Sequence, residues 1–200
     1  RLYYQDVNIL AAISEYEKAI QIEPTNPMIR YELAQAYMTQ IASVDFAEAA
    51  IKELEEVISL DPSNIEAYRD LAFLYSRGHR SDTQSALSLL EQARRVAPRD
   101  KEILMAIGEL KMHEGKSTIA RTYLWEAHRL SPQDPQTYNA IGQTYYEEGR
   151  FTEAVKYFTE ALTLLEGTPY LYSLYGKFST DLYAAQTSEQ LNKKVDELGW

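Results

Sequence analysis

The chain has 200 residues and a formal net charge of −10, and it contains no cysteine. The lack of cysteine excludes disulfides, thiolate nucleophiles and cysteine-based zinc sites. Acidic residues are spread over both halves, so the surface repels phosphate, and we expect neither nucleic acid nor an anionic membrane as a partner. No apolar run approaches the roughly 18 residues that a membrane-spanning helix needs, so we expect no membrane insertion of this segment. The location stays open, with cytoplasmic and periplasmic or other extracytoplasmic compartments both compatible with these features.

The first predicted helix covers residues 8–22, which carry Ala12, Tyr16 and Ala19 and are followed by Pro24. Later apolar stretches are closed by Pro62, Pro98 and Pro132, at successive intervals of 38, 36 and 34 residues. Proline cannot continue a helix, and the polar residues after each proline suit a turn or a helix cap. This spacing predicts one repeat array with complete units at 25–62, 63–98, 99–132 and 133–167, preceded by a partial unit at 1–24.

The four complete units share a large apolar residue and a small residue in their first predicted helix and an alanine in their second. These positions hold Leu33-Ala34 and Ala50, Leu71-Ala72 and Ala86, Ile107-Gly108 and Ala120, and Ile141-Gly142 and Ala154. Small residues let two helices approach closely, and each hairpin alone leaves an apolar face that only stacking can bury. A single helical bundle would also show apolar residues at i, i+3 and i+4, but not four units in the same register.

The last complete unit carries the clearest motif: Tyr138, Ile141-Gly142, Tyr145, Gly149, Ala154, Phe158 and Ala161. This motif resembles the tetratricopeptide (TPR) repeat, W-x2-L-G-x2-Y followed by A-x3-F-x2-A. The resemblance implies an all-α fold, a right-handed α-solenoid of antiparallel helix hairpins that stack into a superhelix.

The ends and the longer units depart from the regular pattern. Tyr3 falls at the late aromatic position of a first helix that is otherwise missing, so we expect the sequence to open within a hairpin and to be cut from a longer array. Residues 168–200 are predicted to form a terminal helix up to Tyr183 and then a separate capping helix, because Thr187-x-x-Gln190 resembles a capping box. The 38- and 36-residue intervals predict insertions of four and two residues in the turns near 41–45 and 79–82.

In tetratricopeptide proteins the first helices line a concave groove that binds ligands, and the resemblance carries this role to the matching positions here. The predicted partner-binding groove consists of Tyr31, Gln35, Met38, Arg69, Phe73, Arg77, Met105, Glu109, Met112, His113, Asn139, Gln143 and Tyr146. Met, Tyr, Phe and Arg are enriched in recognition surfaces. The alternative is that methionines at these positions are packing residues between neighbouring first helices.

One subgroup of the family grips carboxylate-ended chaperone tails with a Lys/Asn/Arg clamp. The matching positions here hold Tyr31 and Gln35, then Asp70, then Glu102 and Ala106. None of these residues fits the clamp, and Glu102 would repel a carboxylate. We therefore expect a peptide or helix of mixed apolar and polar character as the ligand.

Catalytic, cofactor and metal motifs are not found in the sequence. It contains no HExxH, no G-x-G-x-x-G, no phosphate-binding loop and no G-x-S-x-G. Glu109 and His113, at i and i+4, form an ordinary helix pair more readily than an acid–base pair. We therefore expect no enzyme activity, no catalytic or metal-binding residues and no cofactor.

These features predict a scaffold or adaptor that binds a peptide or helix of a partner protein in its concave groove. Two alternatives remain open at this point. The chain could be the regulatory or targeting region of a larger enzyme or of an envelope-assembly protein. It could also be a self-association module that forms a homo-oligomer through the truncated hairpin at residues 1–22.

Overall fold

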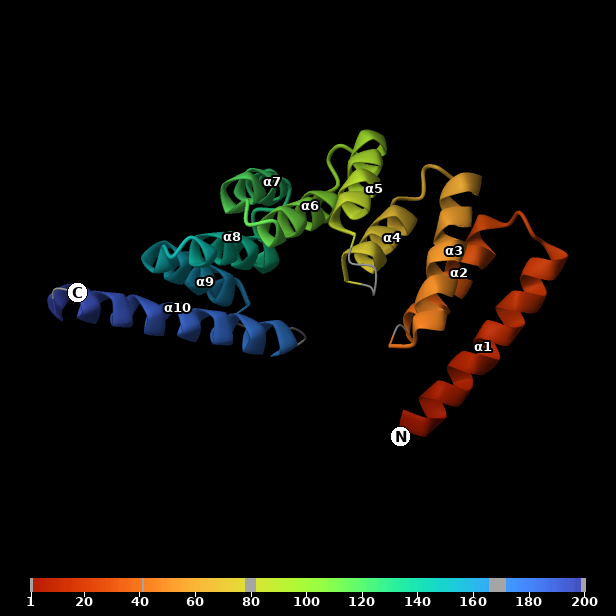
Figure 1. Ribbon diagram of the computed structural model, residues 1–200, viewed down its shortest axis with the longest axis horizontal. Coiled ribbons are helices and arrows are strands. Elements are labelled where there is room, and N and C mark those ends of the chain that lie inside the picture. The colour runs from red at the N-terminus through yellow and green to blue at the C-terminus, as the bar shows by residue number, and fades with distance from the viewer. Residues whose placement is uncertain (1, 41, 78–81, 166–171, 199–200) are drawn as a thin grey trace. The chain divides into compact units, whose positions relative to one another are not determined.

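The computed structural model describes residues 2–40, 42–77, 82–165 and 172–198 (Figure 1). The described residues form ten α-helices and no strand, grouped in two compact units at 1–98 and 99–200. The first unit contains α1 (Leu2–Ile22), α2 (Pro27–Met38), α3 (Val44–Leu60), α4 (Ile65–Arg77) and α5 (Thr83–Val96). The second contains α6 (Lys101–His113), α7 (Ser117–Leu130), α8 (Pro135–Glu147), α9 (Phe151–Leu165) and α10 (Tyr172–Leu198).

Within each unit, neighbouring helices pack as hairpins: α2 with α3 and α4 with α5 in the first, and α6 with α7 and α8 with α9 in the second. The short connections make the two helices of a hairpin antiparallel. The all-α class and the hairpin architecture expected for an α-solenoid are therefore confirmed.

Polar caps begin the first helix of each hairpin, two residues after each of the four prolines. The Asn26 side chain accepts from the backbone N–H of Met28 at 3.0 Å, and Asn64 accepts from that of Ala67 at 2.9 Å. Asp100 and Asp134 cap α6 and α8 in the same way. Such caps satisfy backbone donors that the helix cannot, which explains why the repeat breaks and restarts at these points.

In each hairpin of the second unit, a glycine in the first helix allows the second helix to approach closely. A Cβ placed on Gly108 would lie 2.8 Å from the Leu124 side chain, and one on Gly142 would lie 2.6 Å from the Phe158 ring. The small residues of the motif are therefore required by helix-to-helix distance, as the sequence pattern predicted.

The turns within hairpins follow from a second pair of glycines. Gly115 and Gly149 have φ of +73° and +71°, a left-handed conformation that lets three residues connect α6 to α7 and α8 to α9. In the first unit α2 ends at Met38 and α3 begins at Val44, while α4 ends at Arg77 and α5 begins at Thr83. The insertion predicted near 79–82 falls almost wholly outside the described residues. The predicted four-residue insertion lies only partly in the turn, because α3 itself is lengthened to 17 residues.

Both ends differ from the prediction. The expected terminal and capping helices form one continuous helix, α10, of 27 residues. Thr187 does not cap a new helix, because its hydroxyl donates to the backbone carbonyl of Tyr183 at 2.9 Å within α10. Helix α1 likewise runs without a break from Leu2, so Tyr3 belongs to the same helix as residues 8–22 and not to an earlier one.

Candidate functional site

In the first unit, the predicted groove residues of α2 reach across to α4. The Tyr31 hydroxyl donates to Asp70 at 2.8 Å, and the Gln35 side-chain amide donates to the same carboxylate oxygen at 2.5 Å. Burial and the hydrogen bond to Asp70 raise the pKa of the Tyr31 hydroxyl well above its usual range. These two hydrogen bonds connect the adjacent first helices α2 and α4. Tyr31 and Gln35 are both half-buried.

Helix α4 places the most distinct apolar side chain of the predicted groove at the surface. Phe73 is 39% exposed, and the Arg77 guanidinium lies 5.6 Å from the centre of its ring. An exposed ring with a cation beside it offers apolar area and charge at one place. Arg69 and Met38 are half-buried, while Met28, at the start of α2, is 73% exposed.

In the second unit, the predicted positions divide between core and surface. Met105 is 6% exposed and belongs to the core cluster with Leu104 and Leu124, so it offers almost no surface to a ligand. Asn139 is 4% exposed and donates to Asp181 of α10 at 3.0 Å. The sequence pattern placed Met105 and Asn139 on the groove because it shows which residues share a helix face. It does not show which of them a neighbouring helix covers.

The other predicted positions of the second unit lie at or near the surface. Glu109 and His113 are exposed, whereas Met112 and Gln143 are half-buried. Tyr146 is also half-buried and packs edge-to-face on Phe151 of α9, with ring centres 5.3 Å apart. Tyr146 therefore supports its own hairpin in addition to any surface it presents.

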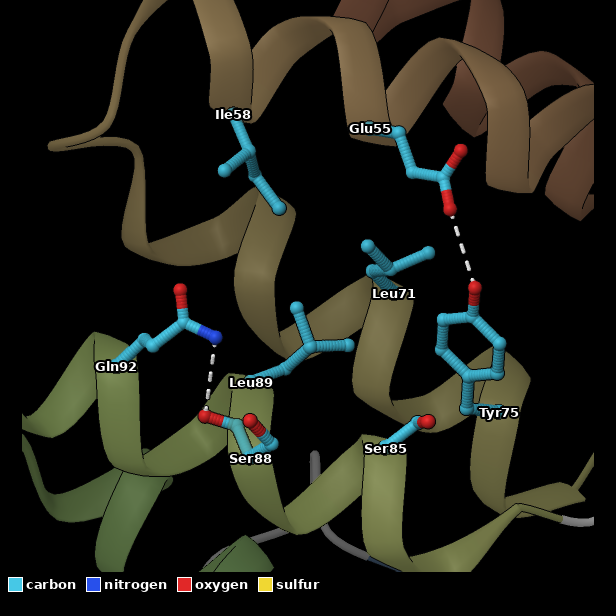
Figure 2. Close-up of a pocket in the computed structure, with 8 residues that line it drawn as sticks. All are labelled: Glu55, Ile58, Leu71, Tyr75, Ser85, Ser88, Leu89 and Gln92. Atoms are coloured by element: carbon cyan, nitrogen blue, oxygen red, sulfur yellow. Dashed lines mark hydrogen bonds between the residues drawn. The ribbon is translucent and has the colours of Figure 1, made fainter.

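A pocket of about 300 Å³, which the sequence pattern does not predict, lies among α3, α4 and α5 (Figure 2). Eight side chains line it: Glu55, Ile58, Leu71, Tyr75, Ser85, Ser88, Leu89 and Gln92. Leu71 and Tyr75 lie on a different side of α4 from Phe73, since the helical period separates them by about half a turn. We call this space the α3–α5 pocket.

Polar groups border an apolar floor in the α3–α5 pocket. The Tyr75 hydroxyl donates to Glu55 at 3.1 Å, and the Gln92 amide donates to the Ser88 carbonyl at 3.3 Å (Figure 2). Leu71 is 2% exposed and closes the base. The short side chains of Ser85 and Ser88 leave the space that larger residues would occupy.

Aromatic rings hold the corresponding positions of the second unit. In the register of the repeat, Trp125 matches Glu55, His128 matches Ile58 and Tyr157 matches Leu89. Trp125 packs edge-to-face on His128 at 5.1 Å and on Tyr157 at 5.9 Å, and Tyr157 stacks on Tyr145 at 5.2 Å. We call these four residues the aromatic cluster.

A buried arginine supports this cluster. Arg121 of α7 is 9% exposed, donates to Glu148 at 2.5 Å and lies 4.0 Å above the Tyr145 ring. Its second terminal nitrogen, Nη1, is buried without a hydrogen-bond partner, and the ring face supplies an electrostatic substitute. Arg121 and Thr118 hydrogen-bond Glu148 and hold the pKa of that carboxyl below its usual range.

No helix among the described residues is both long and apolar enough to cross a membrane. The same residues contain no group of three or more His, Asp or Glu side chains that could hold a metal ion.

The hairpins, their caps and the close-approach glycines define a helical-repeat protein. Family models confirm which one: a model described as TPR repeat matches residues 1–40, and models described as tetratricopeptide repeat match 71–135 and 135–167. The chain belongs to the tetratricopeptide repeat family. Arrays of this kind stack their repeats into extended surfaces that bind other proteins.

Curated relatives share only a segment with this chain. A TPR repeat-containing thioredoxin of Arabidopsis thaliana, TTL4, is 36% identical over 74 residues, which are 37% of this chain and 10% of that protein. The human protein O-mannosyl-transferase TMTC1 is 26% identical over 103 residues, 52% of this chain and 11% of that protein. The chain thus spans about a tenth of the curated relatives it matches.

Solved structures show the same fold. A thermophilic TPR protein of Thermus thermophilus aligns with a TM-score of 0.69 at 23% identity, over 91% of this chain and 94% of that one. MamA aligns at 0.67 and 24%, over 82% and 86%. A chain of the APC/C hetero-tetramer Cut9–Hcn1 aligns at 0.75 and 16%, over 94% and 35%.

Proposed function

We propose that this chain is a protein-interaction scaffold that binds a peptide or helix of a partner along the faces of its first helices. The observation that carries the proposal is Phe73, a large apolar side chain that is 39% exposed beside the Arg77 guanidinium. Covering the exposed part of this ring would remove apolar surface from water, which favours binding, and aromatic residues and Arg are enriched at interfaces.

The neighbouring polar contacts support this assignment. Tyr31 and Gln35 both donate to Asp70, which fixes the relative position of α2 and α4 before any ligand arrives. A surface that is rigid in advance loses less conformational entropy on binding. The partner best suited to this face carries an apolar side chain for Phe73 and a carboxylate for Arg77.

Selection from a random phage-displayed peptide library on the immobilised chain tests the proposal. We expect the selected peptides to lose binding at least about tenfold to Phe73→Ala, since truncating a central interface residue removes more than about 1.4 kcal/mol. Arg77→Glu is expected to weaken the acidic peptides most.

Two exposed aliphatic residues outside the predicted groove provide matched controls. Val96 and Ile119 are 49% and 47% exposed, and their replacement by alanine should leave binding within about twofold. Peptides that bind Phe73→Ala and Arg77→Glu as tightly as the native chain would overturn the groove assignment.

A further inference from the structure

Two hydroxyl groups that line the α3–α5 pocket have already donated their hydrogens. The Tyr75 hydroxyl donates to Glu55 at 3.1 Å, and the Ser85 hydroxyl donates to Asp82 at 2.6 Å. Both hydroxyl oxygens keep lone pairs, and the Glu55 carboxylate has room for further donors. This side of the pocket therefore calls for a ligand that donates hydrogen bonds.

The opposite side of the pocket has the same preference. The Gln92 amide donates to the Ser88 carbonyl at 3.3 Å, and the side-chain oxygen of Gln92 is left as an acceptor (Figure 2). Glu55 is the one charged residue among the described residues that line the pocket. An anionic ligand is repelled, and a ligand with a donor is favoured.

The space between these polar groups has apolar walls. Leu71 is 2% exposed and forms the base, while Ile58, Leu89 and the ring of Tyr75 are half-buried around it (Figure 2). The rim is exposed at three residues: Glu55, Ser88 and Gln92. An apolar group can therefore enter from solvent, and covering these walls favours its binding.

The matching place in the second unit shows which apolar group suits this space. There Tyr157 stacks on Tyr145 with ring centres 5.2 Å apart and an interplanar angle of 1°, and Trp125 packs edge-to-face on Tyr157. In the repeat register Tyr145 matches Tyr75, and Tyr157 matches Leu89. The first unit thus keeps the tyrosine on which a ring stacks, but it has leucine where the second unit supplies that ring.

We propose that the α3–α5 pocket receives the tryptophan side chain of a separate partner protein. Indole is aromatic and carries one N–H that donates and does not accept. Its ring stacks on Tyr75 over Leu89, and its N–H donates to the Glu55 carboxylate. Because the rim is exposed, the peptide backbone that carries the ring stays in water. This site is separate from the first-helix groove and does not rest on it.

The probe is the peptide acetyl-Gly-Gly-Trp-Gly-Gly-amide, titrated into the full chain with isotope-labelled isoleucine and leucine methyl groups. An aromatic ring shields a methyl group beneath it, so NMR should show saturable upfield shifts for Ile58, Leu71 and Leu89. Leu130 is 38% exposed on α7 and reports non-specific binding, and its methyl groups should not shift.

Filling the pocket from within tests the location. Leu89→Tyr supplies the ring that the second unit has at Tyr157, and it should weaken binding at least about tenfold, followed on Ile58 and Leu71. Leu60→Tyr is the matched control, since Leu60 is 37% exposed on α3, and should change binding less than about twofold. Circular dichroism checks that both variants stay folded.

The role of the N–H has a test that does not need Leu89→Tyr to fold. The same peptide with a methyl group on the indole nitrogen cannot donate, and it should bind the native chain at least about threefold more weakly. In Glu55→Leu, a change at an exposed position, the two peptides should bind equally, which completes a double-mutant cycle.

Several results would overturn the proposal: no shift at the three methyl positions, equal binding to Leu89→Tyr and Leu60→Tyr, or equal binding of the two peptides to the native chain. Tighter binding of the corresponding arginine peptide would assign the pocket to a cationic side chain. Binding of free indole without binding of the peptide would assign it to a small molecule. Both outcomes overturn the choice of occupant.

Self-association is the remaining alternative. Sedimentation velocity of the chain alone should show a monomer, and a dimer that Leu89→Tyr removes and Leu60→Tyr retains would assign the pocket to a second copy. Phe73 lies on a different side of α4, so Phe73→Ala should leave the titration unchanged. Failure of this site is therefore distinguishable from failure of the first-helix groove.

Discussion

The α3–α5 pocket and the aromatic cluster occupy the same place in their repeats, yet one is open and the other is filled. Both are bounded by the second helix of one hairpin and by both helices of the next. In the first unit, Glu55 and Leu89 leave a space of about 300 Å³. In the second, Trp125 and Tyr157 fill it with rings whose centres lie 5.9 Å apart.

The difference shows that side-chain size, and not the course of the backbone, decides where a repeat array is hollow. An aromatic pair buries a large area and adds about 0.5–1.5 kcal/mol beyond that burial. The filled site therefore contributes to stability, whereas the open site keeps a surface with a carboxylate, hydroxyls and an apolar floor. Four predictions test this division.

The largest effect is expected from Trp125→Ala. Loss of the half-buried indole should destabilise α7–α9 by about 2–3 kcal/mol, below the full cost of a wholly buried ring. Hydrogen exchange should show faster exchange in these helices and no change in α3–α5. Ile119→Ala, at an exposed position of the same helix, is the control; equal effects of the two would contradict the role of the cluster.

The next effect concerns the close contacts beside the cluster. Gly142→Ala should destabilise the α8–α9 hairpin by about 1–3 kcal/mol, despite alanine's better helix propensity, because its Cβ would meet the Phe158 ring. Gly108→Ala should cost less, since the Leu124 side chain that it meets can change rotamer more easily. Urea titrations that rank the two in the opposite order would contradict this explanation.

A smaller difference is expected between two matching tyrosines. Tyr145→Leu removes the ring beneath the Arg121 guanidinium and should cost about 2 kcal/mol, because the buried Nη1 of Arg121, which makes no hydrogen bond, loses the ring face. Tyr75→Leu removes a hydrogen bond to the exposed Glu55 and should cost less than about 1 kcal/mol. Amide hydrogen-exchange rates in α8 and α4 measure the two losses of stability. Similar losses would mean that the contact between Arg121 and Tyr145 adds nothing to stability.

The smallest effect is a dependence of stability on pH that His128 gives to the filled site. Burial lowers the pKa of His128 below 6.5, so the unfolded chain binds its proton more readily than the folded chain does. Stability from this group is therefore complete above about pH 6.5 and is lost as the pH falls below it. Thermal unfolding between pH 7.5 and 5.5 should show a shallower decline for His128→Phe than for the native chain. His113→Gln, at an exposed position, should follow the native curve.

Much of the groove assignment came from the repeat register, and its errors have a physical cause. The register identified Phe73 and Arg77, which do lie at the surface of α4. It also included Met105 and Asn139, which are buried, because a helix face in sequence does not reveal what the next helix covers. The α3–α5 pocket was missed because it depends on residues of three helices.

The sequence by itself determined the helices, their caps and the hairpin repeat, because prolines, capping residues and small residues act locally and recur at a regular interval. It determined that the Gly142 position must be small, since the contact with Phe158 is made within one hairpin. Only the tertiary structure decided that Arg121 is buried over Tyr145, that α10 is one helix, and that the α3–α5 pocket is open. These features depend on side chains brought together from separate helices, or on continuous helix hydrogen bonding that overrides a local capping motif.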